Sequence, residues 1–333
     1  MAMRWCMPNL TPPSKPKSAK RCRFLTVIAW ALNSSALIDW NFTMKAYPFY
    51  LINVFAESHF GGNPLAVFPH ADGLTDEQMQ AIAKQFNLSE TVFIHPPTDR
   101  HGVSAAADLR IFTPNYELPL AGHPTLGSAF ILKKLYNLPS SFTTNTQAKP
   151  VQIHINDDTV QMAVAGFEVH NITNYSSALH DICGLAPSHI VDTGYFVNAG
   201  TLQFLLQVDS PSALHSAKIN LNNLQQLFIN HPCANGYEPS IYLWAQDDND
   251  DSVVYARMFA KEGDVISEDS GTGSACANLG AYFIQQNQYP IAKTIHQGDD
   301  MGRPNRLTLK VDDEQTIFVG GRVVQVAQGE FLV

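Results

Sequence analysis

Three ionisable side chains stand beside apolar segments, at positions where they could move a proton: Glu90, His123 and Asp269. Glu90 directly precedes the apolar run 91–94, and partial burial there would raise its pKa and suit it to exchanging protons near neutral pH. His123 stands at the start of an apolar helix, whose positive end disfavours an imidazolium, so a neutral ring is expected. Asp269 lies just before a second apolar helix. Each also has a plainer explanation: an exposed glutamate, a capping histidine and a helix-start acid.

Two helix N-termini that face one cleft would supply two groups of free backbone N–H donors with a positive potential. Such a cleft can hold a carboxylate, or an enolate or carbanion that forms beside one. The arrangement suits a cofactor-free reaction in which a proton is removed beside a carbonyl and returned elsewhere. The predicted partner is therefore a small anionic molecule.

The elements that would position these residues follow from hydrophobic periodicity. A capping box at Thr75–Gln78 and apolar residues at helical spacing predict an amphipathic helix over 76–86. The nearly all-apolar run 126–135 predicts a helix enclosed by sheet. Strands are predicted at 49–55, 65–68, 91–94 and 109–112, with a turn at 61–64.

The second half of the chain follows the same plan. The polar segment 138–150 predicts an inter-domain linker. The elements predicted after it are a hairpin of strands at 151–155 and 159–164, a strand at 253–259, and an apolar helix at 275–284 that residues 270–274 open.

An internal repeat relates the two halves at an offset of 147 residues. It predicts two homologous half-domains, each a sheet wrapped on a central helix whose N-terminus points to the domain interface. The matched pairs are Arg110 with Arg257, Glu117 with Asp264, and Thr125 with Thr272, each threonine being followed by small residues.

The composition excludes several classes of protein. Of 333 residues, 30 are acidic and 21 are basic, and six of the bases fall within residues 1–38, which hold no acid. The remaining body is strongly acidic and would repel phosphate backbones, so nucleic acid is not an expected partner. No apolar run reaches the roughly 18 residues that a membrane-spanning helix needs, so no membrane partner is expected.

Cysteine and histidine are spaced without a recognisable ligand pattern. The five cysteines include no CxxC, and the twelve histidines form no close pair. We therefore expect no disulfide framework and no metal, and a reducing, cytoplasmic location. The Gly271-Thr272-Gly273 sequence lacks the third glycine of the dinucleotide fingerprint, so a nucleotide cofactor is not expected either.

Residues 1–45 form an N-terminal extension that looks foreign to the fold. A basic segment precedes the apolar run 24–32, which is the pattern of a signal or transit peptide. An over-long gene start, with the fold beginning near Met44, is the preferred explanation. In both cases the extension is expected to be unstructured.

Taken together, the chain resembles the phenazine-biosynthesis PhzF-like family, which has the diaminopimelate-epimerase-type fold. The resemblance rests on seven motifs in the family's order: 53–55 with 62–68, 87–93, 110–114 with 117–119, 121–127, 257–260, 268–269 with 272–275, and 297–298 with 302–304. It implies an α+β fold of two pseudo-symmetric half-domains, 46–145 and 150–333, each a mixed sheet around a central apolar helix. It also implies an active site between them, a homodimer, and a C-terminal segment, Glu330–Val333, that crosses back to the first half.

The resemblance also implies roles for individual residues. Glu90 matches the family's acid/base, and His123 and Asp269 match the residues that assist it. No cofactor and no metal are implied, and the namesake reaction isomerises a dihydro-hydroxyanthranilate by shifting a hydrogen. The positions that match substrate-binding or orienting residues are Ser89, Gly122, Thr272, Gly273 and Ser274.

The sequence departs from the family where Ser270-Gly271 replaces the usual Pro-Ala. Ser270 falls where related racemases place one catalytic cysteine, and His123 lies near the place of the other, so two-thiol racemisation is disfavoured. Cys276 is expected to be a core thiol. An amino- or imino-acid racemase or epimerase remains one alternative, and a non-catalytic protein that binds small molecules is another.

Overall fold

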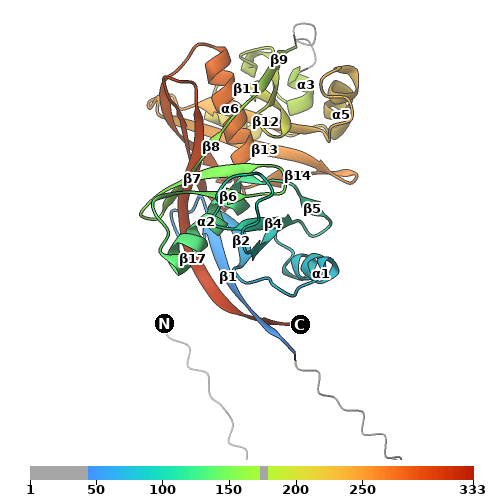
Figure 1. The fold of residues 1–333 in the computed structure, drawn as a ribbon. Coiled ribbons are helices and arrows are strands. Elements are labelled where there is room, and N and C mark those ends of the chain that lie inside the picture. Colours follow the sequence, from blue (N-terminus) through green and yellow to red (C-terminus); the bar gives the residue numbers. More distant parts are fainter. Residues whose placement is uncertain (1–43, 173–178) are drawn as a thin grey trace, which may run out of the picture. The chain divides into compact units, whose positions relative to one another are not determined.

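Two apolar helices form the centres of the fold. α2 (Gly122–Tyr136) and α6 (Gly273–Gln285) bury most of their residues, and a helix without a polar face has to be enclosed by protein. Strands surround both helices (Figure 1). The computed structural model describes residues 44–172 and 179–333, and Lys45–Val333 form one compact unit. Residues 1–43 of the predicted N-terminal extension lie outside the described residues, whereas Lys45 already exchanges backbone hydrogen bonds with Val333.

The elements follow one another along the chain as a mostly β structure with six α-helices among the described residues. The strands are β1 (Ala46–Val54), β2 (Asn63–Phe68), β3 (Glu90–His95), β4 (Asp108–Phe112), β5 (Glu117–Leu118), β6 (Ser141–Asn145), β7 (Pro150–Asn156), β8 (Thr159–Val164), β9 (Glu168–Asn171), β10 (Tyr195–Asn198), β11 (Leu202–Gln207), β12 (Ser240–Gln246), β13 (Val253–Glu262), β14 (Val265–Asp269), β15 (Ile291–Gln297), β16 (Asn305–Val311) and β17 (Ile317–Leu332). The helices besides α2 and α6 are α1 (Asp76–Phe86), α3 (Leu179–Cys183), α4 (Pro211–Ser216) and α5 (Leu221–Asn230), with a 3₁₀ turn, η2 (Pro187–His189).

The strands of the first half pair in a closed circuit around α2. The order of pairing is β1–β2–β3–β4–β6–β7–β8–β17, and β17 returns to β1. The central helix contacts seven of these eight strands. Closing the circuit leaves no free edge and satisfies the backbone hydrogen bonds around the helix.

The second half wraps α6 with an open run of strands. Here the order is β17–β16–β15–β13–β12–β11–β10–β9, with parallel pairs at β13–β15 and β11–β12. The long strand β17 belongs to both halves, because its first residues pair with β8 and β16 and its last residues pair with β1. Figure 1 shows this strand running beside both central helices.

The strands and helices predicted from periodicity are present, with some different limits. The capping box at Thr75 opens α1 as predicted. The two central helices start earlier than expected, at Gly122 and Gly273. In α2 this early start is compatible with Pro124, because proline is tolerated in the first turn of a helix. His123 therefore lies within the first turn of α2.

The prediction of a linker over 138–150 was wrong for residues 141–145. These residues form β6, which pairs with β7 and with the start of β4. Its polar composition suggested a loop, but Phe142 and Thr144 alternate toward the inside and are buried. A strand that closes the circuit around α2 needs only its inward residues to be compatible with the core.

The structure also corrects the internal repeat. In the first half, Arg110 pairs with Glu117, seven residues later. The offset of 147 would match this with a pair of Arg257 and Asp264, but Arg257 pairs with Glu268 instead. The hairpin β13–β14 is four residues longer than β4–β5, so the offset becomes 151 after it. The central helices share this second offset, because both begin at a glycine, and Thr125 and Thr272 consequently occupy different helical positions.

The predicted α+β fold class, with sheet wrapped around central helices, is confirmed by the structure. The boundary between half-domains 46–145 and 150–333 stays a prediction, since Lys45–Val333 form one unit. The last residues of β17 pair with β1, with Glu330 opposite Pro48. The described residues of the stretch 165–252, for which the sequence suggested no elements, form β9 to β12, the helices α3, α4 and α5, and the 3₁₀ turn η2.

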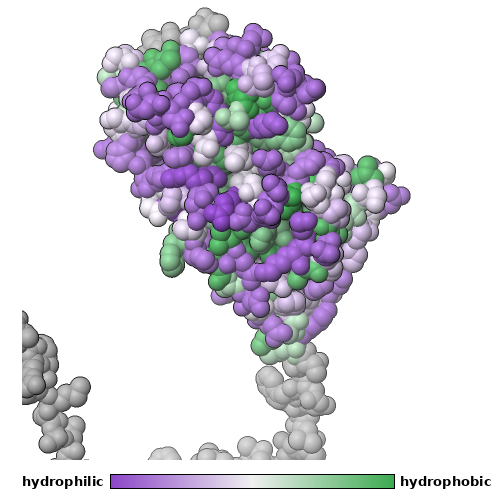
Figure 2. Space-filling view, turned by 90° about the vertical axis from the view of Figure 1, so that its left-hand side faces the viewer, coloured by the Kyte–Doolittle hydropathy of each residue, from purple (hydrophilic) through white to green (hydrophobic). Residues whose placement is uncertain are grey.

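The surface seen in Figure 2 is mostly hydrophilic. Its hydrophobic residues appear as separate groups divided by polar side chains. Across the described parts of the chain, no helix combines the length and the apolar character that crossing a membrane requires.

Candidate active site

The first turns of the two central helices meet. A Cβ atom placed on Gly122 would lie 3.7 Å from the Cα atom of Gly273, which shows how closely the backbones approach. Neither N-cap residue, Ala121 or Thr272, caps its helix with a side-chain hydrogen bond. The first-turn N–H groups of both helices therefore converge on one place, with the positive potential that favours an anion.

Glu90 and His123 form a close, nearly buried pair beside this place. Glu90 is the first residue of β3, and His123 is in the first turn of α2. The Oε2 atom of Glu90 lies 3.4 Å from the Nε2 atom of His123, and their side chains are 15% and 7% exposed. Neither atom has a hydrogen-bond partner among the described residues. Two buried polar atoms in this state are unusual, because an unmet hydrogen bond is costly away from water.

Burial shifts both members of the pair toward their uncharged forms. It raises the pKa of Glu90 to about 8, with a further increase from the negative charge of Asp269. It also lowers the pKa of His123 to about 3, although a hydrogen bond with the backbone of Pro64 works in the other direction. Because proline has no N–H, the ring must donate to the Pro64 carbonyl. With Nε2 unpartnered, this leaves Nε2 as the acceptor that faces Glu90.

Asp269, at the end of β14, is the most strongly hydrogen-bonded of the three. Its carboxylate accepts from Thr272 Oγ1 at 2.5 Å, from Asn63 Nδ2 at 3.2 Å and from the backbone N–H of Gly271 at 3.3 Å. Burial raises the pKa of Asp269, and these hydrogen bonds oppose the increase. These three donors favour the ionised form of Asp269 relative to a buried carboxyl group without them.

Two residues that had been assigned no role hold this arrangement together. Asn63 reaches Asp269 from β2, 206 positions earlier in the chain. Gln297 donates to Thr272 Oγ1 and to the carbonyl of Asp269, while its own oxygen accepts from the backbone of Thr272. Both residues belong to motifs that were recognised in the sequence, but only their contacts show what they do.

The remaining predicted residues lie around the same place. Ser89 adjoins Glu90 and is exposed. Ser274, in the first turn of α6, accepts a hydrogen bond from Gln203, whose amide is held in turn by Asn278. The structure therefore links six of the eight residues by contact or close approach, and Ser89 and Ser274 lie next to two of these six, Glu90 and Gly273, in the chain.

Two other ionisable groups near Asp269, the Cys276 thiol and the Tyr242 phenol, are kept uncharged by burial. Cys276 is completely buried, and burial raises its pKa, so it is a core thiol as predicted. Tyr242 of β12 is also fully buried, and its hydroxyl has no hydrogen-bond partner among the described residues. Ser270 is nearly buried and occupies a position where a racemase would need a cysteine.

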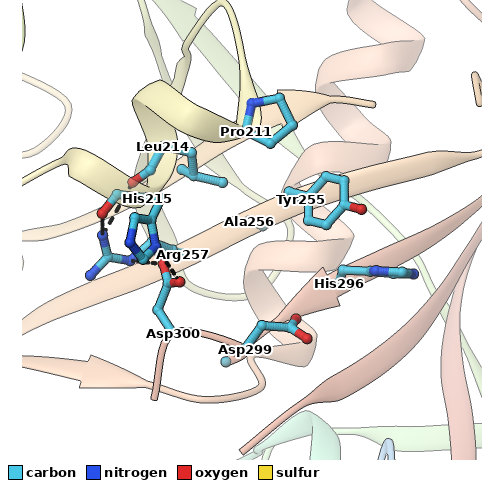
Figure 3. Close-up of a pocket in the computed structure, with 10 residues that line it drawn as sticks. Pro211, Leu214, His215, Tyr255, Ala256, Arg257, His296, Asp299 and Asp300 are labelled. Atoms are coloured by element: carbon cyan, nitrogen blue, oxygen red, sulfur yellow. Dashed lines mark hydrogen bonds and ion pairs between the residues drawn. The ribbon is translucent and has the colours of Figure 1, made fainter. Parts of the chain in front are cut away.

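A separate cavity is lined in part by residues of β13. It has a volume of about 200 Å³, and Figure 3 shows Leu214, Tyr255 and Arg257 lining it together with Asp299 and Asp300. Arg257 donates to Glu268 and to the carbonyls at the end of α4. Asp299 and Asp300 have ion-pair partners in Arg306 and His215, whereas the facing atoms of Glu90 and His123 have no hydrogen-bond partner among the described residues.

Metal ligands are not grouped in the part of the chain that the structure describes. No set of three histidine, cysteine or acidic side chains is arranged to hold a metal ion there. The chemistry of the site lies instead in a carboxyl group that titrates near neutral pH, a neutral imidazole, a second carboxylate and two helix N-termini. Such a site can take a proton from a bound anion and return it.

The sequence profile of the family described as phenazine biosynthesis-like protein matches residues 52–329. A relative from Pasteurella multocida, named as an uncharacterized isomerase, is 44% identical over 87% of this chain and 96% of that protein. The chain belongs to the phenazine biosynthesis-like protein family. The resemblance found in the sequence is thus confirmed.

Two further comparisons agree with this membership. A trans-2,3-dihydro-3-hydroxyanthranilate isomerase from Pseudomonas fluorescens is 30% identical over 79% of this chain and 89% of that protein. A PhzF-family phenazine biosynthesis protein from Bacillus anthracis has the same fold, with a TM-score of 0.74 and 24% identity over 87% of this chain and all of that one. The protein is an isomerase, as the sequence predicted.

Proposed function

We propose that the protein is a cofactor-independent isomerase that moves a proton on a small carboxylate-bearing metabolite, with Glu90 as the acid and base. One observation carries the proposal: a nearly buried carboxyl group, with an unpartnered oxygen, whose pKa is raised to about 8. A general base works best when its pKa lies near the working pH. Glu90 meets this condition because of its burial and of the charge on Asp269.

The reaction uses one proton carrier twice. Ionised Glu90 removes a proton from a carbon beside a carbonyl or carboxylate, and the electron pair of the broken C–H bond spreads into that group. The protonated Glu90 then returns the proton to a second carbon, so that no oxidant and no second base are needed. The Nε2 atom of His123, 3.4 Å away, can accept a hydrogen bond from the protonated carboxyl group.

The negative charge that develops on the substrate is stabilised by the two helix N-termini. The uncapped first turns of α2 and α6 present backbone N–H groups at the place where Gly122 approaches Gly273. Groups fixed in this way stabilise a developing anion without having to reorganise. Ser89, next to Glu90 in the chain, and Ser274, next to Gly273, are proposed to orient the substrate, with Thr272 acting through Asp269.

The proposed substrate class is a small cyclic carboxylate. This rests on the relative from Pseudomonas fluorescens, whose name states a cyclic amino acid with a hydroxyl group as its substrate. The anion site and the nearly closed surroundings of Glu90 suit a molecule of that kind. A racemase with two thiols has less support, because the positions concerned hold Ser270 and His123 and because Cys276 is buried.

Solvent deuterium incorporation tests the role of Glu90. Small cyclic carboxylates are incubated with enzyme in D₂O, and the mass of each is followed for wild type and Glu90→Gln. The glutamine keeps the shape of the side chain but cannot exchange a proton, so incorporation should slow by about 10² to 10⁴-fold. Glu77→Gln, which changes an exposed glutamate on α1, is the matched control and should exchange as wild type does. Equal exchange in wild type and Glu90→Gln would show that another group carries the proton.

A further inference from the structure

The start of β2 contacts all three of the proposed catalytic residues. Three consecutive residues, 63–65, make these contacts, and each of them addresses a different element. The contacts are the Asn63 side chain with Asp269 of β14, the Pro64 backbone with the His123 ring of α2, and the parallel pairing of Leu65 with Glu90 of β3. A single short segment therefore fixes the positions of the three groups relative to one another.

The Asn63 side chain links β2, which packs against α2, to the loop that leads into α6. This side chain is buried, with 1% exposed. Its Nδ2 atom lies 3.2 Å from Asp269 Oδ1 and 2.9 Å from the carbonyl oxygen of Gly271, so both amide hydrogens have acceptors. The two bonds fix the loop that leads from Asp269 into α6, and they leave Asp269 little freedom to turn.

These bonds also affect charge. A donor on a carboxylate favours its ionised form, so the Asn63 amide lowers the pKa of Asp269 against the effect of burial. The negative charge on Asp269, second to burial, raises the pKa of Glu90. Breaking the contact at Asn63 would therefore act on Glu90 through Asp269, without touching Glu90 itself.

Other titratable groups face this pair, and none replaces Asn63. His123 from α2 is held neutral by burial. Burial also disfavours the ionised forms of Tyr242 from β12 and Cys276 from α6. Arg303, whose guanidinium group lies beside the start of β2, donates to the Gly62 carbonyl and to the Asn53 side chain, not to Asp269.

We propose that Asn63 is a positioning residue that holds Asp269 in place and ionised, and thereby controls when Glu90 can exchange its proton. The proposal rests on the proposed function for its catalytic meaning. Its physical content, a coupling from Asn63 through Asp269 to Glu90, holds whether or not a substrate has been found.

The chain contains a matched control for this contact. Asn145 is also fully buried, and its Nδ2 atom lies 2.8 Å from Asp108 Oδ1 and 3.2 Å from the carbonyl oxygen of Thr98. Asp108 pairs with His95, at the far end of the strand that begins with Glu90. At about 3.3 Å per residue, this end of β3 is about 16 Å from Glu90. Asn145→Ala thus removes the same kind of interaction away from the site.

Carbon-13 NMR of labelled side-chain carboxyl groups tests the coupling directly. The titrations of Asp269 and Glu90 are followed in wild type, Asn63→Ala and Asn145→Ala. In Asn63→Ala we expect the pKa of Asp269 to rise and that of Glu90 to fall, because Asp269 then carries less negative charge. In Asn145→Ala both should titrate as in wild type. Unchanged titrations in Asn63→Ala, or equal shifts in both variants, would overturn the proposal.

Two additions keep the test decisive. If Asn63→Ala does not fold, Asn63→Asp keeps the shape, removes the donors and should also raise the pKa of Asp269. Deuterium exchange into a substrate should show its pH midpoint moved to lower pH in Asn63→Ala and unmoved in Asn145→Ala. Absence of exchange in wild type with every carboxylate would count against the proposed function alone, since the NMR titration still decides the role of Asn63.

Discussion

The Nε2 atom of His123 lies 3.4 Å from the Oε2 atom of Glu90, and among the described residues each atom lacks any other partner. Burial disfavours charge on both residues, so the resting pair is a protonated carboxyl group facing a neutral imidazole. The two groups can share one proton without creating a buried charge. Under the proposed function, this relationship leaves Glu90 poised to exchange a proton near neutral pH.

The pH dependence of kcat/KM should report the titration of Glu90. If Glu90 first acts as a base, kcat/KM rises with pH and levels off above about 8. Asp269→Asn removes the negative charge that contributes to this value, so the rising limb should move to lower pH. Steady-state kinetics at closely spaced pH values on both sides of about 8 check this. A limb that stays in place in Asp269→Asn would contradict the coupling of the two carboxyl groups.

Stability should also depend on pH through Glu90. Its pKa is about 8 in the folded protein and 4.5 ordinarily, so between these values the folded state binds more protons than the unfolded state. Wild type therefore loses stability as pH rises through this window, whereas Glu90→Gln does not. The melting temperature of Glu90→Gln relative to wild type should increase from about pH 4.5 to pH 8 and then stay constant.

His123 does not disturb that comparison. Its pKa is lowered to about 3 in the folded protein, so its contribution is lost as pH falls below its ordinary value of 6.5. This loss occurs in both wild type and Glu90→Gln and cancels in their difference. Thermal unfolding at closely spaced pH values is the measurement, and a constant difference across the window would contradict the raised pKa of Glu90.

The paired arginines of the two halves should differ in their contribution to stability. Arg257 donates to Glu268 and to three carbonyls at the C-terminal end of α4, with 13% of its side chain exposed. Arg257→Met leaves these acceptors unpaired and should lower the free energy of unfolding by about 3 kcal/mol. The same substitution at the equivalent Arg110, whose side chain is 24% exposed, should lower the free energy of unfolding by less.

A surface arginine provides the control for this measurement. Arg322 pairs with Asp158, and both side chains are 41% exposed. Arg322→Met should therefore cost less than about 1 kcal/mol in urea unfolding. Equal losses in Arg257→Met and Arg322→Met would show that burial of the ion pair does not matter here.

Gly271 should tolerate no side chain. A Cβ atom there would collide with the side-chain amide of Asn305, which is itself buried. Gly271→Ala should therefore displace the loop that carries Asp269 and lower kcat by about tenfold or more, since small misplacements of catalytic groups are costly. Adding Asn305→Ala makes room and should restore part of the loss. No change in Gly271→Ala would mean that the loop can shift without moving Asp269.

Much of the fold could be predicted because its signals are local. The capping box of α1 and the apolar run of α2 depend only on neighbouring residues, and both helices are present. Strand β6 was missed because its inward residues, Phe142 and Thr144, are set among polar ones. Its place is decided by its partners β4 and β7, which no local pattern reveals.

The repeat shows the same limit. Counting residues from Arg110 and Arg257 placed the second acid at Asp264, but the structure pairs Arg257 with Glu268. A hairpin can lengthen by two residues on each strand without changing which side chains share a face, because the side-chain period of a strand is two. Residue spacing in the sequence does not reveal this lengthening, whereas the ion pair of Arg257 with Glu268 in the structure does.

The sequence by itself determined the family, the two apolar helices and the choice of Glu90, His123 and Asp269 as candidate catalytic residues, because these depend on residue types in a fixed order along the chain. The tertiary structure alone decided the charges of these residues. Burial and the approach of Asp269 raise the pKa of Glu90, and burial lowers that of His123. It also decided that Asn63 lies against Asp269, 206 positions away. Electrostatic effects depend on distance and on exclusion of water, and only folding sets either of them.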